Sequence, residues 1–193
     1  GEYGIIAPVG IQQLRQALPG WLEDAENGLT DSFRALLNGL AEDLRYLDDR
    51  IVESVRKNPV AKRLMTLCGV GPLTASALSG ALGDGKAFRR GRDFAASLGL
   101  TPKQHSTGGR DRLLGISKRG DSYLRKQLVH GARAVLRHVD GKDDGLSHWL
   151  KGLASRKHFN VATVALANKT ARIAWALAHG EEDYDEKLAA AGA

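Results

Sequence analysis

The residues best suited to chemistry gather in one stretch near the middle of the chain, residues 101–120. Two hydroxyl side chains, Ser106 and Thr107, precede a pair of glycines, Gly108 and Gly109. The surrounding basic residues are Lys103, His105, Arg110, Arg112, Lys118 and Arg119. Glycines let backbone amides turn toward an anion at little steric cost, and arginine guanidinium groups bind phosphate oxygens in pairs. The stretch therefore predicts contact with phosphate groups, either as a reactive site or as a basic loop that only touches nucleic acid.

The net charge of +6 is unevenly distributed along the 193 residues. Thirteen basic and three acidic residues lie between positions 86 and 137, a local charge of +10 that leaves −4 for the rest of the chain. Such a concentrated basic region predicts a polyanionic partner. Nucleic acid is favoured over a membrane surface, because the region lacks an amphipathic helix with exposed bulky apolar residues.

The chain carries no apolar run that approaches the roughly 18 residues of a membrane span, and its first residues do not have the pattern of a secretory signal. Its single cysteine, Cys68, cannot form an internal disulfide, so a reducing cytoplasm is the expected compartment. Cys68 lies in the apolar run LMTLCGVG and is expected to be a small core residue rather than a nucleophile.

The longest helical pattern covers Asp31–Lys57, where apolar residues recur at alternating spacings of four and three. This heptad seam consists of Phe33, Leu37, Leu40, Leu44, Leu47 and Ile51. A helix of this length would extend roughly 40 Å, more than a small core covers, so the seam predicts a coiled coil with a second copy of the chain. The alternative is an amphipathic helix that packs on its own domain.

A second recognisable pattern is GVGPLTA, residues 69–75. Gly69 and Gly71 are expected to provide a tight turn and a close backbone approach, and Pro72 suits the first position of the next helix. The pattern resembles the helix-hairpin-helix motif, in which amides at the start of the second helix bind a DNA phosphate without reading sequence. A structural turn between two packed helices explains the same residues.

The remaining periodicity predicts an all-α protein with a long coiled-coil helix followed by a compact helical domain. Helices are expected at residues 11–18, 60–67, 73–82, 89–98, 121–139, 146–156 and 161–179. Asp121 and Asn160 are expected N-caps. Residues 113–116 are expected to return to the core, and no strand is predicted. Arg125 is assigned to the outer, basic face of the helix over 121–139, together with Lys126, Arg133 and Arg137.

Three segments together resemble one family: GVGPLTASALSGALGDGKAF, FAASLGLTPKQHSTGGRDRLLGISKRGDSYLRKQLVHGARAVLRH and NVATVALANKTARIAWALAHGEEDYD. They are similar to the C-terminal transposase domain of the bridge-RNA-guided insertion-sequence transposases, the IS110 family. The resemblance implies a connector at 1–20, a coiled-coil segment at 21–58, a helical transposase domain at 59–185 and a flexible tail at 186–193. It also implies an N-terminal RNase-H-like domain that binds Mg²⁺ through acidic residues, which this chain lacks, so the chain is expected to be a C-terminal fragment that binds no metal or other cofactor.

In that family a serine of the HS-S/T-GG segment attacks DNA and becomes linked to a 5′-phosphate, and the matching residue here is Ser106. The resemblance thus implies a cytoplasmic transposase fragment, inactive alone, with DNA, a bridge RNA and further copies of the chain as partners: a dimer, and a tetramer on DNA. Lys103, His105, Thr107, Gly108, Gly109, Arg110, Arg112, Lys118, Arg119, Gly69 and Gly71 are the expected nucleic-acid contacts. The alternative is a non-catalytic helix-hairpin-helix module that binds DNA or RNA. A small-molecule hydrolase is disfavoured because no Ser-His-Asp order occurs in a strand-turn-helix setting.

Overall fold

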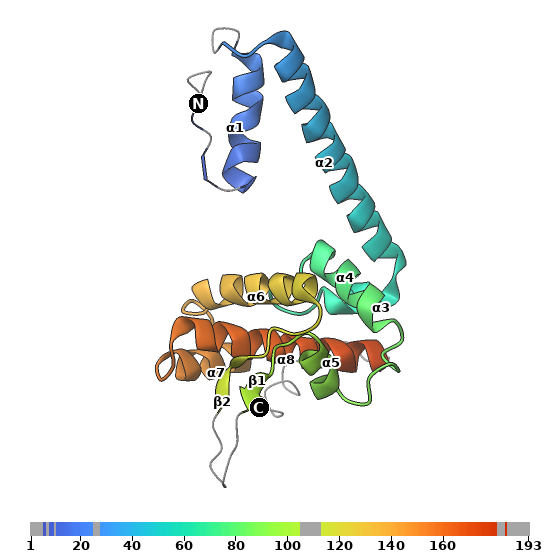
Figure 1. The fold of residues 1–193 in the computed structure, drawn as a ribbon, viewed down its shortest axis with the longest axis vertical. Coiled ribbons are helices and arrows are strands. Elements are labelled where there is room, and N and C mark those ends of the chain that lie inside the picture. The colour runs from blue at the N-terminus through green and yellow to red at the C-terminus, as the bar shows by residue number, and fades with distance from the viewer. Residues whose placement is uncertain are drawn as a thin grey trace. The chain divides into compact units, whose positions relative to one another are not determined.

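The computed structural model describes residues 6, 8, 9, 11–24, 28–104, 113–180 and 184. The chain divides into two compact units, Gly1–Ile51 and Val52–Ala193. Both are built from helices, and the strands of the described part form a single two-stranded sheet in the second unit (Figure 1). The all-α prediction is therefore confirmed at the level of fold class. None of the helices in the described part of the chain is long and apolar enough to cross a membrane.

The first unit contains α1, Ile11–Glu23, and most of α2, Asp31–Lys57. The bounds predicted for α2 are confirmed. The prediction that the first helix ends at residue 18 is wrong, because α1 continues through Pro19 to Glu23. Tertiary contacts outweigh the cost of the proline. The guanidinium group of Arg34 donates to the carbonyl oxygens of Trp21 and Leu22, each at 2.9 Å, and so satisfies acceptors at the end of α1.

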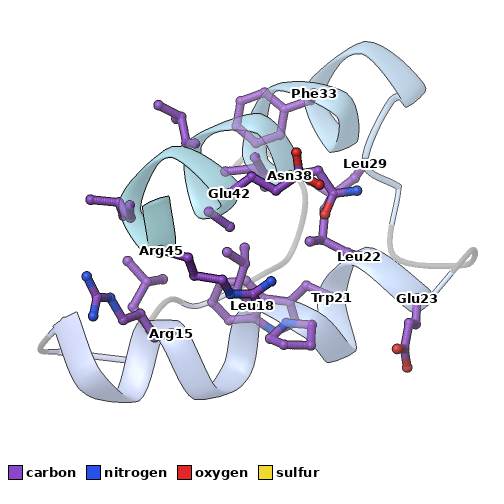
Figure 2. A pocket seen from close by; sticks show the side chains of 16 residues that line it. Arg15, Leu18, Trp21, Leu22, Glu23, Leu29, Phe33, Asn38, Glu42 and Arg45 are labelled. Atoms are coloured by element: carbon purple, nitrogen blue, oxygen red, sulfur yellow. The ribbon is translucent and has the colours of Figure 1, made fainter. Parts of the chain in front are cut away.

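An apolar groove of about 920 Å³ lies between α1 and α2 (Figure 2). Residues of the heptad seam line it from α2, and Leu18, Trp21 and Leu22 line it from α1. An ion pair between Arg15 and Asp48, with 2.9 Å between nitrogen and oxygen, joins the two helices nearby. Although α1 packs here, much of the seam stays accessible in the single chain. The exposed fractions of Leu40, Leu44 and Leu47 are 52%, 41% and 55%.

The second unit is organised around α8, Phe159–His179, which packs against α3, Pro59–Leu64; α4, Pro72–Leu82; α5, Gly91–Ser97; α6, Ser122–Arg137; and α7, Gly145–Ala154 (Figure 1). The buried face of α8 is rich in alanine, which lets neighbouring backbones approach closely. A Cβ atom on Gly91 would lie 2.8 Å from the carbonyl oxygen of Arg172, so α5 touches α8 backbone to backbone. Leu78, Phe94, Leu128 and Leu150 complete the core around α8.

Of the two predicted N-cap residues, one is confirmed and one is wrong. Asp121 is the N-cap of α6, as predicted, and its side chain accepts a hydrogen bond from the backbone N–H of Leu124 at 2.9 Å. The prediction that Asn160 caps the last helix is wrong. The helix begins earlier, at Phe159, and the ring nitrogen of His158 accepts from the N–H of Asn160 at 3.1 Å.

Two further predictions are corrected in the second unit. The chain forms strands β1, Pro102–Gln104, and β2, Leu113–Ile116, which pair antiparallel with Pro102 opposite Ile116. Leu114 is 42% exposed, so this segment pairs as a hairpin strand instead of returning to the core. Cys68 is exposed rather than buried, because its neighbours Leu67 and Val70 take the inward positions of the turn.

Candidate nucleic-acid interface

Most of the residues predicted for the reactive site lie outside the described residues. This applies to His105, Ser106, Thr107, Gly108, Gly109, Arg110 and Arg112. The structure does describe the two strands that lead into and out of this segment, and the helices on which those strands rest. Lys103 lies on β1, and Lys118 and Arg119 follow β2; all three side chains are exposed. The described geometry is therefore that of the base of the hairpin, the residues on either side of 105–112 in the sequence.

Two glycines interlock at this base. Gly99, after α5, and Gly120, before α6, both have positive φ, at 67° and 78°. A Cβ atom on Gly120 would overlap the carbonyl oxygen of Ser97, and one on Gly99 would overlap that of Arg119. The backbone N–H of Lys118 donates to the carbonyl oxygen of Gly99 at 3.1 Å, and the N–H of Ser117 donates to that of Thr101 at 2.8 Å. The chain entering the hairpin and the chain leaving it are thus packed backbone to backbone, which only glycine permits.

Two side chains from neighbouring helices fasten the same base. Arg125 of α6 donates from Nη1 to the carbonyl oxygen of Leu98 at 2.9 Å and to that of Arg119 at 3.2 Å. Asn168 of α8 donates from Nδ2 to the carbonyl oxygen of Leu100 at 3.2 Å. The assignment of Arg125 to the outer basic face is therefore wrong: its guanidinium group serves the hairpin base. Sequence reasoning missed Asn168 altogether, because residues so far apart in the chain give no local signal.

Arg125→Ala is expected to lower the free energy of unfolding by about 0.5–1.5 kcal/mol, because it removes the donor to partly buried and exposed carbonyl oxygens at the hairpin base. Urea denaturation followed by circular dichroism measures the change. Lys126→Ala, one residue along on the exposed side of α6, is the matched control and is expected to stay within about 0.5 kcal/mol of the parent. Equal stability of the two variants would show that Arg125 does not hold the hairpin.

The turn that resembles a helix-hairpin-helix motif also rests on glycine packing. Gly69 has a φ of 82°, and a Cβ atom there would lie 2.7 Å from the carbonyl oxygen of Gly131 in α6. Gly69 thus provides both the turn and the close approach. Gly71 is the N-cap of α4 with a φ of −91°, and a Cβ atom there would meet nothing within 4 Å. Pro72 takes the first helical position, as predicted. A phosphate contact at this turn stays a prediction.

Buried charge is rare in the described residues, and Lys169 of α8 is the one charged side chain that is buried. Its ammonium nitrogen lies 5.2 Å from the centroid of the Trp149 ring, a cation–π contact between α8 and α7. Burial, and secondarily the charge of Arg172, lower the pKa of Lys169. This contact packs one helix on another. Among the described residues, no group of three or more His, Cys, Asp or Glu side chains lies close enough together to hold a metal ion.

Comparison with known proteins identifies the segment that holds this hairpin. Residues 61–145 match the family described as Transposase IS116/IS110/IS902 family. A probable family 20 transposase of Pseudomonas aeruginosa is 46% identical over 192 residues, which cover 95% of this chain and 57% of that protein. The transposase for insertion sequence element IS1111A of Coxiella burnetii is 43% identical over 190 residues, covering 95% of this chain and 52% of that protein.

A third relative is the transposase for insertion sequence element IS1328 of Yersinia enterocolitica, 41% identical over 181 residues, which cover 90% of this chain and 53% of that protein. The chain thus spans about half the length of the curated relatives it matches. The matched family segment runs from α3 into α7 and includes both strands, the interlocked glycines and all of α6. The domain formed by residues 61–145 is therefore a transposase domain of the IS116/IS110/IS902 family.

Proposed function

We propose that this chain is part of a DNA transposase and supplies the serine nucleophile, Ser106, for DNA strand cleavage and exchange. One observation carries the proposal: the family match over residues 61–145 contains the whole hairpin that bears Ser106, together with its base. The basic side chains of Lys103, Lys118 and Arg119, exposed at that base, support a site that receives phosphate.

The proposed step is an attack of the Ser106 hydroxyl oxygen on a DNA phosphorus atom. The new Oγ–P bond replaces the bond between phosphorus and the 3′-oxygen, so the 5′-phosphate stays on the serine and a 3′-hydroxyl leaves. A base removes the serine proton, and a proton is returned to the departing 3′-oxygen. A 3′-hydroxyl from another strand then reverses the chemistry and restores a phosphodiester.

Within this proposal the chain's basic residues stabilise charge. The pentacoordinate transition state carries more negative charge on its oxygens than the diester does, and donors fixed in advance lower its energy most. The hairpin base is a suitable place for such donors, because Arg125, Asn168 and the interlocked glycines hold its backbone in place. We further propose that the acidic residues and Mg²⁺ that help activate Ser106 belong to another part of the full-length protein, and that a bridge RNA selects the DNA.

A covalent trap tests the function. The intact protein, incubated with DNA it can cleave and then denatured, is expected to yield a protein–DNA adduct that maps by mass spectrometry to a peptide containing Ser106. A tight complex that never yields an adduct would contradict the catalytic proposal. It would favour the second candidate, a binding module that uses the α3–α4 turn, where Gly69 and Gly71 lie beside the start of α4.

The exposed seam of α2 supports a further part of the proposal, pairing with a second copy of the chain. Leu40→Asp together with Leu44→Asp is expected to convert a dimer to a monomer. The reason is that a symmetric dimer would bury four of these leucines. Each is about half exposed in the single chain, so its burial contributes about 1 kcal/mol of hydrophobic free energy. Light scattering at micromolar concentration measures the change in mass.

The matched control is Ala35→Asp with Gly39→Asp, which adds the same charge to α2 at exposed positions that do not line the apolar groove. The control is expected to stay a dimer. A parent protein that is monomeric at high micromolar concentration would contradict the assembly.

A further inference from the structure

The outer face of α6 carries a continuous row of basic side chains. The helix buries Leu124, Leu128, Ala132 and Leu136 against the core. On the opposite side the exposed residues Lys126, His130, Arg133 and Arg137 follow one another at spacings of four, three and four. Residues three and four apart lie on the same face of a helix, so these side chains form one row roughly 17 Å long at 1.5 Å per residue.

The charge of this row is not balanced by nearby carboxylates. α6 contains no acidic residue, and in the described part of the chain no ion pair involves Lys126, Arg133 or Arg137. Elsewhere lysines do pair with neighbours: Lys57 with Glu53 at 2.6 Å and Lys86 with Asp84 at 3.0 Å. The ammonium of Lys126 lies 5.6 Å from the ring centroid of Tyr123, which keeps it over the helix surface without neutralising it.

Helix stability explains only part of the pattern. A cation in the last turn, such as Arg137, interacts favourably with the helix dipole, whereas Lys126 lies near the positive end and gains nothing from it. The adjacent Arg125 shows what an arginine of α6 does when it serves the fold: it turns inward and donates to two carbonyl oxygens. Lys126, Arg133 and Arg137 have no such acceptor among the described residues.

We infer that the outer face of α6 is a second nucleic-acid contact, one that binds the phosphate groups of a duplex through Lys126, Arg133 and Arg137. The contact lies on the helix that immediately follows the Ser106 hairpin, since Asp121 caps α6 directly after Arg119 and Gly120. The inference rests on the proposal that the chain acts on nucleic acid, and it concerns contacts to the backbone rather than to bases.

The test compares two triple variants of the intact protein by fluorescence anisotropy with labelled duplexes at several salt concentrations. The first is Lys126→Ala with Arg133→Ala and Arg137→Ala. The control is Lys62→Ala with Lys142→Ala and Lys157→Ala. It removes the same charge at exposed positions in α3 and on either side of α7, none of which forms an ion pair among the described residues.

Each lost phosphate contact lowers the slope of log K against log salt by about 0.9 for duplex DNA, so the α6 variant is expected to lose about 2.7 in slope. Its affinity should fall by a similar factor on unrelated sequences, while the control keeps a slope close to the parental one. Parallel titrations are run with duplex DNA and with duplex RNA. The duplex that α6 binds is the one whose salt slope falls in the α6 variant.

Three results would overturn the inference. An unchanged slope in the α6 variant for both duplexes means that this face makes no contact. An equal loss in the control means that the effect is one of net charge alone. If the parent protein binds neither duplex, the proposed function fails together with the inference. If the parent forms the covalent adduct and the α6 variant binds like the parent, only the inference is refuted. Melting temperatures of both variants within a few degrees of the parent confirm that each is folded.

Discussion

Ser106→Ala is expected to abolish the covalent protein–DNA adduct and DNA strand exchange while leaving folding and nucleic-acid binding unchanged. Alanine lacks the hydroxyl oxygen that forms the bond to phosphorus, so no intermediate can arise. The sequence places Ser106 between a polar run and a glycine pair, and removal of a hydroxyl in such a setting changes the free energy of unfolding by no more than about 0.5 kcal/mol. Adduct formation, strand exchange, thermal melting and binding to uncleaved DNA are measured on the same preparation of the intact protein.

Two further variants sharpen this experiment. Thr107→Ala removes the neighbouring hydroxyl and is expected to keep adduct formation, which makes it the matched control. Ser106→Cys replaces one nucleophile by another and is expected to retain a small part of the adduct signal. If Ser106→Ala exchanges strands at the parental rate, the assignment is wrong, and Thr107 and Ser117 are the next residues to test.

Gly120→Ala is expected to destabilise the second unit by roughly 3 kcal/mol or more. The residue has a φ of 78°, where a Cβ atom is strained, and that atom would overlap the carbonyl oxygen of Ser97. The neighbouring backbone has to move, and the bond from the N–H of Lys118 to Gly99 is expected to weaken with it. Chemical denaturation of the variant and the parent, followed by circular dichroism, measures the loss.

The matched control is Gly115→Ala, in β2 of the same hairpin. This glycine has no positive φ, and a Cβ atom there would meet nothing within 4 Å. The substitution is expected to change stability by less than about 0.5 kcal/mol. A Gly120→Ala protein as stable as the Gly115→Ala protein would show that the close contact at the hairpin base is not needed for the fold.

The features predicted correctly from the sequence are those that depend on neighbouring residues. The bounds of α2 follow from a long heptad pattern, and the cap at Asp121 follows from a carboxylate placed just before an amphipathic run. Pro72 at the start of α4 is equally local, since its fixed φ suits the first helical position. In each case the residues that determine the element are within one or two turns of it.

The wrong predictions concern elements whose structure is determined by residues far away in the sequence. α1 continues past Pro19 because Arg34, in the next helix, supplies donors to its last carbonyl oxygens. β1 and β2 are too short for alternation to be visible, and they pair because the glycines at 99 and 120 bring the ends of the hairpin together. The sequence does carry one signal for this reversal: a glycine directly after a helix and another directly before an N-cap are both typical of chain reversals.

In the candidate site, too, some features follow from the local sequence and others do not. The reactive role of Ser106 comes from family resemblance, because one serine beside basic residues does not by itself distinguish a nucleophile from a phosphate contact. The basic composition of α6 was visible in the sequence, but the division between Arg125, which faces the hairpin, and Lys126, which faces outward, required the fold. Periodicity alone assigns both to the polar side of the helix.

The hydrogen bonds by which Arg125 and Asn168 hold the hairpin have a consequence for how its base responds to pH. Both attachments join a guanidinium or an amide to backbone carbonyl oxygens, so neither contains a carboxylate or an imidazole. An anchor made of a carboxylate and an amine would loosen in acid as the carboxylate became protonated. The hairpin base should therefore keep its geometry across the working range of pH. A change in reaction rate with pH would then report on the groups that exchange protons during catalysis, and not on the scaffold that carries Ser106.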